Sequence, residues 1–327
     1  LVSSELLKYP KRFGFPDEKV KLLDDTEGSR YTALANVQSK EAKAPNEYTS
    51  VRKKYSLNNN DSLTVSISGI SSDLIQITKY YIFNRNSHLV EVQQVVQNKS
   101  LKDSEWRQYN TLSRGEETEG NAMLYTYTGA AYFDNEDKFN KIDFSDIEDE
   151  SFQKETMRGW ISMIQHYFFT AWLPSTKASE KKTIYTRLLS IDNKNSYQIG
   201  SVDSYFNLSP GESKSFDSKL YVGPKVQAEI TDLAPGLALT VDYGVLTFLA
   251  APLFWVLEKI HLVFGNWGWS IIMLTILIKI VFFKLSESSY KSMAKMKKLT
   301  PRMTALKERF GDDKKQFSEA LMKIYKE

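Results

Sequence analysis

The stretch Trp267–Phe283 reads WGWSIIMLTILIKIVFF and determines how the rest of the chain is organised. Its only strongly polar side chain is Lys279. Extended to Leu285, the stretch approaches the ~20 residues that an α-helix needs to cross a hydrocarbon core of ~30 Å. Trp267 and Trp269 stand at its start, and indole rings favour the headgroup region of a bilayer. We therefore predict one transmembrane helix here.

Charge is distributed unevenly around this span. Acidic side chains slightly outnumber basic ones in residues 1–235, whereas basic side chains are in clear excess in residues 236–327. By the positive-inside rule, the basic C-terminal side is cytoplasmic, and the N-terminal part lies in the periplasm of a bacterium with two membranes. This topology explains the basic excess, so no nucleic-acid binding is expected. The basic residues that follow the span are Lys284, Lys291, Lys295, Lys297, Lys298 and Arg302.

The first two-thirds of the chain has the pattern of an antiparallel β protein. From about Ser62 to Val222, short runs of alternating apolar and polar residues recur between clusters of Asn, Asp, Gly and Ser, which is typical of a β-sandwich. The predicted strands include Leu63–Ile67, Leu74–Phe83, Leu89–Val96, Ala122–Phe133, Thr183–Ile191, Ser196–Phe206 and Ser215–Val222.

The stretch Gly159–Leu173 is dense in aromatic residues, including Trp160 and Trp172. We interpret it as buried sheet core, because contiguous aromatic residues in a sandwich usually pack inside. The alternative is a surface on which sugar rings stack, which would make the chain a membrane-anchored periplasmic carbohydrate-binding β-sandwich.

Gly244–Phe264 has apolar residues at helical spacing and a second face with Glu258 and His261, so an amphipathic helix is predicted. Pro252 should kink this helix. The adjacent charges of Glu258 and Lys259 make a full crossing costly, which favours a helix lying in the membrane interface over a second span.

After the span, apolar residues recur at three- and four-residue steps up to Gly311, where a helix would end. Asp312 or Asp313 could cap a second helix with Phe317, Leu321 and Ile324 on one face. The two helices could pair as an antiparallel hairpin, a motif suited to docking rather than to chemistry. The first apolar stripe comprises Met293, Met296, Leu299, Met303, Leu306 and Phe310.

Motifs that carry catalysis are missing from the sequence. His88, His166 and His261 lie far apart without metal-ligand spacing, and the acidic run Asp143–Glu150 is typical of a solvated turn. The chain contains no Cys and no phosphate-binding loop, dinucleotide fingerprint or GxSxG sequence. We therefore predict no catalytic residue, metal or cofactor, and no enzymatic activity.

Lys279 is the candidate functional residue, with Thr275 one helical turn earlier on the same face. A charge near the middle of a span costs about 2.5–3.5 kcal/mol on insertion scales, and such residues usually face protein or a water-filled cavity. The alternative is that Lys279 snorkels to the cytoplasmic headgroups, since it stands only five residues before Lys284.

Sequence motifs around the span resemble the YidC family of bacterial membrane protein insertases. They are Gly265–Ser270, Lys279, Tyr290–Met296, and further segments at Gly129–Tyr132, Gly159–Ile161, His166–Phe168, Tyr221–Pro224, Thr240–Gly244 and Glu308–Lys314. The resemblance covers nearly the whole chain after about residue 120.

The resemblance implies a mostly β fold: a large antiparallel periplasmic β-sandwich (residues 1–235), an interfacial helix and one transmembrane helix (236–287), and a truncated cytoplasmic helical hairpin (288–327). It implies a membrane protein insertase and chaperone, in which a hydrophilic groove with Lys279 and Thr275 receives polar segments of incoming chains. The implied partners are nascent inner-membrane proteins, the lipid bilayer, the Sec translocon, and a ribosome or targeting factor at the hairpin. The first span and the later core spans of the family are absent from this sequence.

Two positions depart from the family pattern. The family usually has Arg at the position of Lys279, and Lys provides a point charge without the planar fork of Arg. Lys284 stands where related proteins often have Pro, so we expect a straighter cytoplasmic end of the span.

Overall fold

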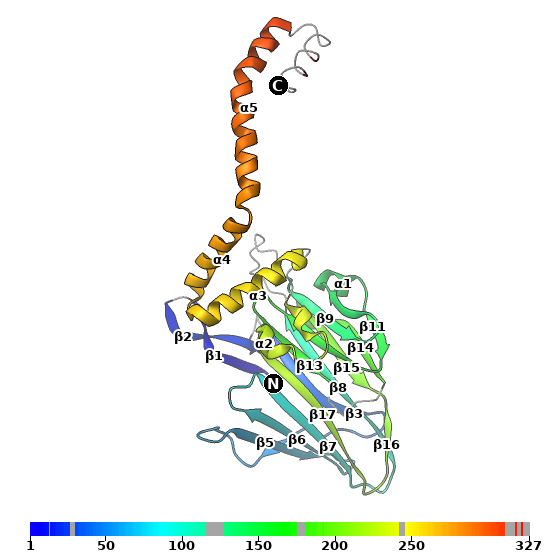
Figure 1. Cartoon of the computed structure of the whole chain (residues 1–327). Helices are drawn as coiled ribbons and strands as arrows, with labels where there is room; N and C mark the ends of the chain where they lie inside the picture. The colour runs from blue at the N-terminus through cyan, green and yellow to red at the C-terminus, as the bar shows by residue number, and fades with distance from the viewer. Residues whose placement is uncertain are drawn as a thin grey trace. The chain divides into compact units, whose positions relative to one another are not determined.

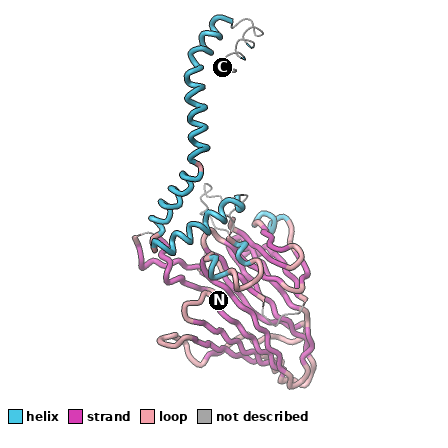
Figure 2. The backbone as a smooth tube through the Cα atoms, viewed as in Figure 1, coloured by secondary structure: helices cyan, strands magenta, loops and turns pink. Residues whose placement is uncertain are grey.

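The computed structural model describes residues 1–12, 14–26, 30–115, 127–174, 181–191, 193–241 and 246–310, together with Ser318 and Met322. The chain divides into two compact units, unit 1 (Leu1–Val241) and unit 2 (Asp242–Glu327). Strands dominate unit 1, and helices make up the described part of unit 2 (Figures 1 and 2).

In the part of the chain that the structure describes, the larger sheet of unit 1 has nine antiparallel strands. The three consecutive strands β5 (Ser62–Ile70), β6 (Ile75–Asn84) and β7 (Leu89–Asn98) form a meander, and β7 pairs with β17 (Ser213–Pro224). The other edge of β17 pairs with β13 (Phe168–Leu173), so segments far apart in sequence become neighbours. In spatial order the strands are β10 (Lys138–Ile142), β9 (Gly129–Asp134), β12 (Gly159–Ile164), β13 (Phe168–Leu173), β17 (Ser213–Pro224), β7 (Leu89–Asn98), β6 (Ile75–Asn84), β5 (Ser62–Ile70) and β4 (Thr49–Ser50).

The second sheet is built around the long strand β8 (Ser104–Gly115). Its path is β11 (Gln153–Thr156), β14 (Lys182–Ile191), β15 (Lys194–Asp203), β8 and β16 (Phe206–Leu208), and β3 (Thr32–Ser39) also pairs with β8. The remaining elements of unit 1 are the hairpin β1 (Ser3–Arg12) and β2 (Phe15–Asp24), the helices α1 (Phe144–Asp149) and α2 (Gln227–Ile230), and the 3₁₀ turn η1 (Leu237–Thr240).

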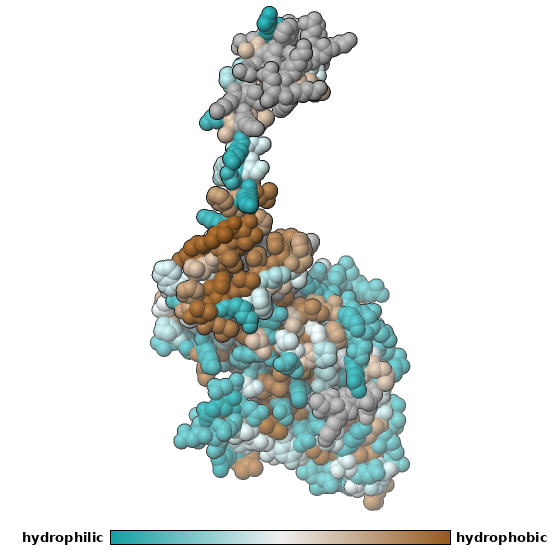
Figure 3. All heavy atoms as spheres, viewed as in Figure 1, coloured by the Kyte–Doolittle hydropathy of each residue, from teal (hydrophilic) through white to brown (hydrophobic). Residues whose placement is uncertain are grey.

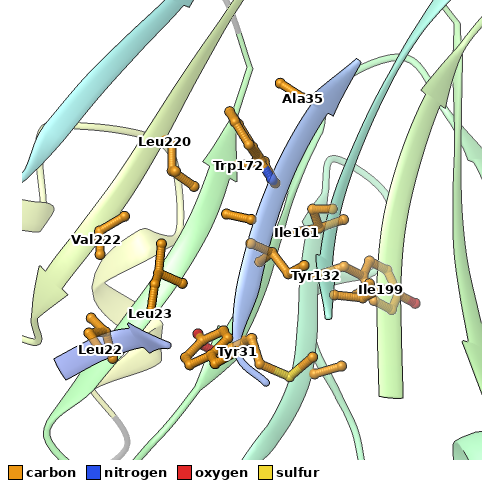
Figure 4. Packing of buried hydrophobic residues seen from close by; sticks show 14 of the residues in the cluster. Leu22, Leu23, Tyr31, Ala35, Tyr132, Ile161, Trp172, Ile199, Leu220 and Val222 are labelled. Atoms are coloured by element: carbon orange, nitrogen blue, oxygen red, sulfur yellow. The ribbon is translucent and has the colours of Figure 1, made fainter. Parts of the chain in front are cut away.

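The main hydrophobic core lies between the two sheets. It joins residues of the larger sheet, such as Ile161, Trp172 and Leu220, to residues of the smaller one, such as Ile199. Figure 4 shows these side chains converging, with Leu23 of the β1–β2 hairpin beside them. Unit 1 is therefore a two-layered antiparallel sandwich, as the sequence predicted.

A second core covers the outer face of the larger sheet. The segment from α2 to η1 packs Ile230 and Leu237 on Phe169, and Trp160 donates its indole N–H to the Pro235 carbonyl at 2.9 Å. Gly236 follows with φ +72°, where a Cβ atom would stand only 2.3 Å from the Phe133 ring. A glycine is therefore required for this turn to lie close to the sheet.

The described part of unit 2 consists of three helices: α3 (Thr247–Phe264), α4 (Trp267–Val281) and α5 (Phe283–Phe310). Space-filling Figure 3 shows hydrophobic residues gathered over α3 and α4, whereas hydrophilic residues are frequent along α5. Among the described residues of unit 2, only Ser270 is buried. These helices therefore lack a core of their own.

Most predicted strands are confirmed, including those at Leu63–Ile67, Leu74–Phe83, Leu89–Val96, Thr183–Ile191 and Ser215–Val222. The strand predicted at Ala122–Phe133 is confirmed from Gly129 onward as β9, Tyr127 and Thr128 lie outside the strand, and residues 122–126 are not among the described residues. The strands β1, β2, β3 and β8 were not predicted.

Candidate functional site

The candidate site lies in unit 2, where a tight turn joins α3 to α4. Gly265 ends α3 with φ +62°, and its N–H donates to the His261 carbonyl at 2.8 Å. Asn266 caps α4, since its side-chain oxygen accepts from the N–H groups of Gly268 (2.8 Å) and Trp269 (3.3 Å). The His261 ring stacks on Trp267 across the turn, with ring centroids 3.9 Å apart. The Gly-Asn pair thus explains why one helix ends and the next begins here.

The helix α4 ends at Val281, earlier than predicted, and α5 continues from Phe283 at an angle of 60°. At the break, the Phe282 N–H is shared between the carbonyls of Ile278 and Ile280, which tightens the last turn. The expectation of a straighter end at Lys284 is therefore wrong, because the chain bends at Phe282 without a proline.

Lys279 lines a hollow of about 720 Å³ that is formed by residues from both sides of this bend. Within the described residues, no carboxylate lies within ion-pair distance of its ammonium group. The nearest acidic residue of the hollow, Glu287, pairs instead with Lys291 at 2.6 Å. Within the described residues, Lys279 is thus a cation without a counter-ion at a hollow that also holds the Glu287–Lys291 ion pair. Its lining residues are Ile278, Lys279, Phe282, Phe283, Ser286, Glu287, Tyr290, Lys291 and Ala294.

Thr275 is exposed on α4 but does not line this hollow. Its hydroxyl donates to the Ile271 carbonyl at 2.8 Å, the usual bond of a threonine inside an apolar helix. The structure therefore keeps Thr275 one turn from Lys279, but it does not bring the two side chains to one hollow.

Ser286, Glu287 and Tyr290 were not among the predicted site residues. The sequence pattern predicted the span and the following helix as separate elements, whereas α5 runs continuously from Phe283 to Phe310. The i,i+4 spacing of Glu287 and Lys291 was the available signal, because it places an ion pair directly after the apolar stretch.

The helices that are long and apolar enough to cross a membrane differ from the prediction of one span at Trp267–Phe283. By length and composition, α3 alone could cross a membrane within the described chain. The helix α4 passes the same test only together with Phe283–Ala294, across the 60° bend. Pro252 lies inside α3, which continues unbroken through it rather than ending there.

The predicted helical hairpin is described only in its first half. The helix α5 reaches Phe310, and Met293 and Met296 are exposed along it. Gly311, the predicted caps and the second apolar stripe lie outside the described residues, so the pairing of two helices stays a prediction.

The aromatic stretch of unit 1 is core, as predicted. Trp160 and Trp172 are 2% and 3% exposed, and the indole N–H of Trp172 donates to the Thr111 carbonyl at 3.0 Å. Rings buried this deeply cannot stack on sugars, so the alternative of a carbohydrate surface at these residues is wrong.

The three histidines occupy separate places. His88 contacts Glu229 at 3.1 Å, His166 packs against Tyr167, and His261 stacks on Trp267. Within the described residues, no three side chains of the metal-binding types lie together.

A sandwich with its own core, joined to exposed apolar helices, defines a membrane-anchored protein with a large domain outside the bilayer. The family described as YidC periplasmic domain matches residues 1–256, and the family described as 60Kd inner membrane protein matches residues 259–327. The chain belongs to the YidC family of the bacterial inner membrane. This membership confirms the prediction that the chain is not an enzyme, because YidC is a family of insertases.

Relatives named membrane protein insertase YidC match along the whole chain. The protein of Thioalkalivibrio sulfidiphilus is 42% identical over 340 residues and that of Nitrosococcus oceani is 37% identical over 335 residues, each match covering 100% of this chain. The chain spans 60% of the length of each of these relatives.

Solved structures give only a weak likeness. A galactose mutarotase-like protein from Clostridium acetobutylicum is 13% identical, with a TM-score of 0.35 over 54% of this chain and 66% of that chain. At that score, the likeness carries no information about function.

Proposed function

We propose that the chain forms part of a membrane protein insertase and chaperone, which assists the insertion, folding and assembly of inner-membrane proteins. The family and the names of the relatives support this assignment. The single observation that carries it is Lys279, a cation without a counter-ion within the described residues, lining a hollow in an apolar helix.

The proposed mechanism is electrostatic. A polar segment that enters the hydrocarbon region loses its hydration, at a cost of several kcal/mol for an unpaired charge. Lys279 would attract a carboxylate of such a segment and lower this cost while its hydrophobic neighbours move into lipid. Thr275, one turn away, would extend a polar stripe along α4. No covalent bond is made or broken.

The proposed topology places residues 1–235 in the periplasm, residues 236–287 in the membrane and residues 288–327 in the cytoplasm. In this topology α3 lies in the interface, because Glu258 and Lys259 are costly in a hydrocarbon core. The helix α4 then crosses with the first residues of α5, since its 15 residues span only about 22 Å on their own.

The proposed partners are nascent membrane proteins, the lipid bilayer and the Sec translocon. The cytoplasmic segment from Ser289 would receive a ribosome or targeting factor, with exposed Met293 and Met296 offering adaptable contacts.

Replacement of Lys279 by Ala in the full-length protein tests the groove role. Insertion of substrates with acidic translocated segments should fall about tenfold, the factor that 1.4 kcal/mol of lost attraction gives. K279R should retain activity because it keeps the charge. Insertion is measured by protease protection of the translocated segment in inverted vesicles.

The matched control is K284A, which removes the next lysine of the chain and keeps Lys279 and Lys291 in the hollow. Equal insertion by the wild type and K279A across a panel of acidic substrates would contradict the groove role. An equal loss in K284A would instead assign the effect to general basic charge near the headgroups.

A further inference from the structure

The strand β5 forms the outer edge of the larger sheet along most of its length. Its partner on that side, β4, pairs only with Ile67 and Ser68. In the part of the chain that the structure describes, no other strand pairs with the remainder of β5 on this side. Figure 1 shows β5 at one margin of the sheet, beside β6. Backbone groups of β5 are therefore left open at this margin.

Hydrogen bonds from β4 show which backbone groups of β5 point outward. The Thr49 hydroxyl donates to the Ser68 carbonyl at 3.2 Å. The Ser50 hydroxyl donates to the Ser66 carbonyl, also at 3.2 Å. Because the backbone groups of every second residue of a strand face the same side, the N–H and carbonyl of Thr64 point outward as well. Thr64 is exposed, and within the described residues nothing beyond this edge bonds to its backbone groups.

The strand β5 lacks the features that usually protect a sheet edge from pairing. Its sequence SLTVSISGI contains no charged residue and no proline. It pairs with β6 without a bulge, from Ser62 opposite Asn84 to Ile70 opposite Gln76. The strand at the other margin of the same sheet, β10, has only five residues, two of them lysines. An uncharged, regular edge is prone to pair with another chain, which favours a strand as the partner of β5.

The inner face of β5 offers apolar contacts to such a strand. Leu63 lies opposite Phe83 of β6, whose ring packs against the main core. Val65 lies opposite Tyr81, which packs against the same core. Leu63 and Val65 themselves are only half-buried. An additional strand would cover them with its own alternate side chains.

A basic segment lies beside the open part of this edge. Arg52, Lys53 and Lys54 follow shortly after β4 and are exposed. The Arg52 N–H donates to the Tyr55 hydroxyl at 3.3 Å, and this hydroxyl lies 2.7 Å from the Ser50 hydroxyl, which itself bonds to the edge. Within the described residues, no carboxylate lies within ion-pair distance of these cations. Positive charge beside the open edge favours a strand that carries acidic residues.

We propose that the open edge of β5 binds an extended polypeptide segment that carries acidic residues. The segment would pair with the backbone groups of Thr64 in the place that β4 leaves after Ser50, and its carboxylates would meet the basic segment 52–54. In this mode of recognition, main-chain hydrogen bonds supply affinity and side-chain contacts supply selectivity. The site lies wholly within unit 1 and requires no insertase activity, so this proposal and the proposed function can fail separately.

Binding is measured with the whole chain in detergent by fluorescence anisotropy. The probe is a fluorescein-labelled peptide of three glutamates followed by three Thr-Val repeats, and we expect it to bind saturably. In one matched peptide, lysines replace the glutamates. In another, every backbone nitrogen of the repeats is methylated, which removes the donors needed for strand pairing. Each matched peptide should bind about tenfold more weakly than the probe.

The backbone requirement is tested on the chain by T64P. Proline removes the outward N–H of residue 64, a change that an edge strand tolerates, and should weaken binding of the probe about tenfold. The matched control T64V keeps this N–H and should bind as the wild type does. Near-UV circular dichroism verifies that both variants are folded, and the methylated peptide tests the same requirement with the unaltered chain.

The charge requirement is tested by R52E/K53E/K54E, which should weaken binding of the probe about tenfold and strengthen binding of the lysine peptide. The matched control K8E/K11E/R12E reverses the same number of charges at exposed positions of β1 and should leave binding unchanged.

Absence of saturable binding of the glutamate probe would overturn the proposal. So would binding that is indifferent to backbone methylation and to T64P, or an equal loss in the two charge-reversal variants. Dimers of the chain that exclude the probe and are abolished by T64P in sedimentation would also overturn it, because the occupant of the edge would then be a second copy.

Discussion

The two units of this chain use hydrophobic residues in opposite ways. Unit 1 buries the aromatic side chains of its core, with Trp106 at 0% and Trp160 at 2% exposure. In unit 2, Trp269 and Ile280 are 61% and 67% exposed. Apolar side chains in the first unit satisfy one another, whereas those in the second need lipid or further membrane spans. Unit 1 is therefore a self-contained fold, whereas the exposed apolar side chains of unit 2 need apolar surroundings.

Two lysines show the same contrast for charge. Lys79 of unit 1 is buried, and its ammonium group donates to the Ala35 carbonyl at 3.1 Å and to the Asn36 side chain at 3.0 Å. Lys279 of unit 2 is exposed at a hollow without a carboxylate partner in the described chain. The first is satisfied by its own domain, and the second is available to an incoming group.

The largest effect is expected from W160A. Its indole ring stacks on Phe133 with centroids 5.9 Å apart, and its N–H satisfies the Pro235 carbonyl. Removing it should lower the free energy of unfolding of unit 1 by about 3–5 kcal/mol. Urea titration of the whole chain in detergent, followed by protease resistance of unit 1, measures this loss.

W269A is the matched control, since it removes an equally large ring from the exposed face of α4. Unit 1 should then unfold at the wild-type urea concentration. Equal destabilisation by the two variants would break the contrast between the units, because it would show that α4 contributes to the core of unit 1.

Sequence periodicity predicted the strands in which apolar residues occupy most inward positions, such as β6 and β7. It missed β8 because its inward positions include Gln108, Asn110 and Arg114, which are buried polar residues and erase the alternation. It also missed β1 and β2, a hairpin in which most positions are exposed. Only tertiary contacts explain how such strands are stabilised.

For the candidate site, sequence alone identified Lys279, because a single charge in an apolar stretch is conspicuous. It could not locate the hollow, since the break at Phe282 leaves no Pro or Gly signal. The bend brings residues on both sides of the break around one cavity, and no spacing rule predicts that arrangement.

An intermediate effect is expected from pH through Lys79. Burial lowers the pKa of Lys79 from 10.5 to about 8, so between these values the unfolded chain binds the extra proton. Stability should therefore rise from pH 8 to pH 10, by about 2 kcal/mol. Above pH 10 tyrosines act in the opposite direction, since burial raises the pKa of Tyr48 to about 12.

The measurement compares urea midpoints of the wild type and K79M at intervals from pH 7 to pH 10. The difference between the two proteins isolates the contribution of Lys79, and it should change with pH in favour of the wild type. A constant difference would mean that the fold does not lower the pKa of Lys79. K279M should show no such dependence in unit 1, because that lysine belongs to the other unit.

The smallest effect is expected from N266A, which tests whether the order of unit 2 has local causes. Loss of the cap leaves the N–H groups of Gly268 and Trp269 without their acceptor and should cost about 1 kcal/mol. Hydrogen exchange of these two amides should accelerate about fivefold, whereas N266D should keep them protected. The exchange of unit 1 should stay unchanged in both variants. If these two amides exchange as slowly in N266A as in the wild type, surrounding lipid or other spans, rather than the cap, stabilise the start of α4. The backbone hydrogen bonds of unit 2 would then depend on its surroundings, as its exposed apolar side chains do.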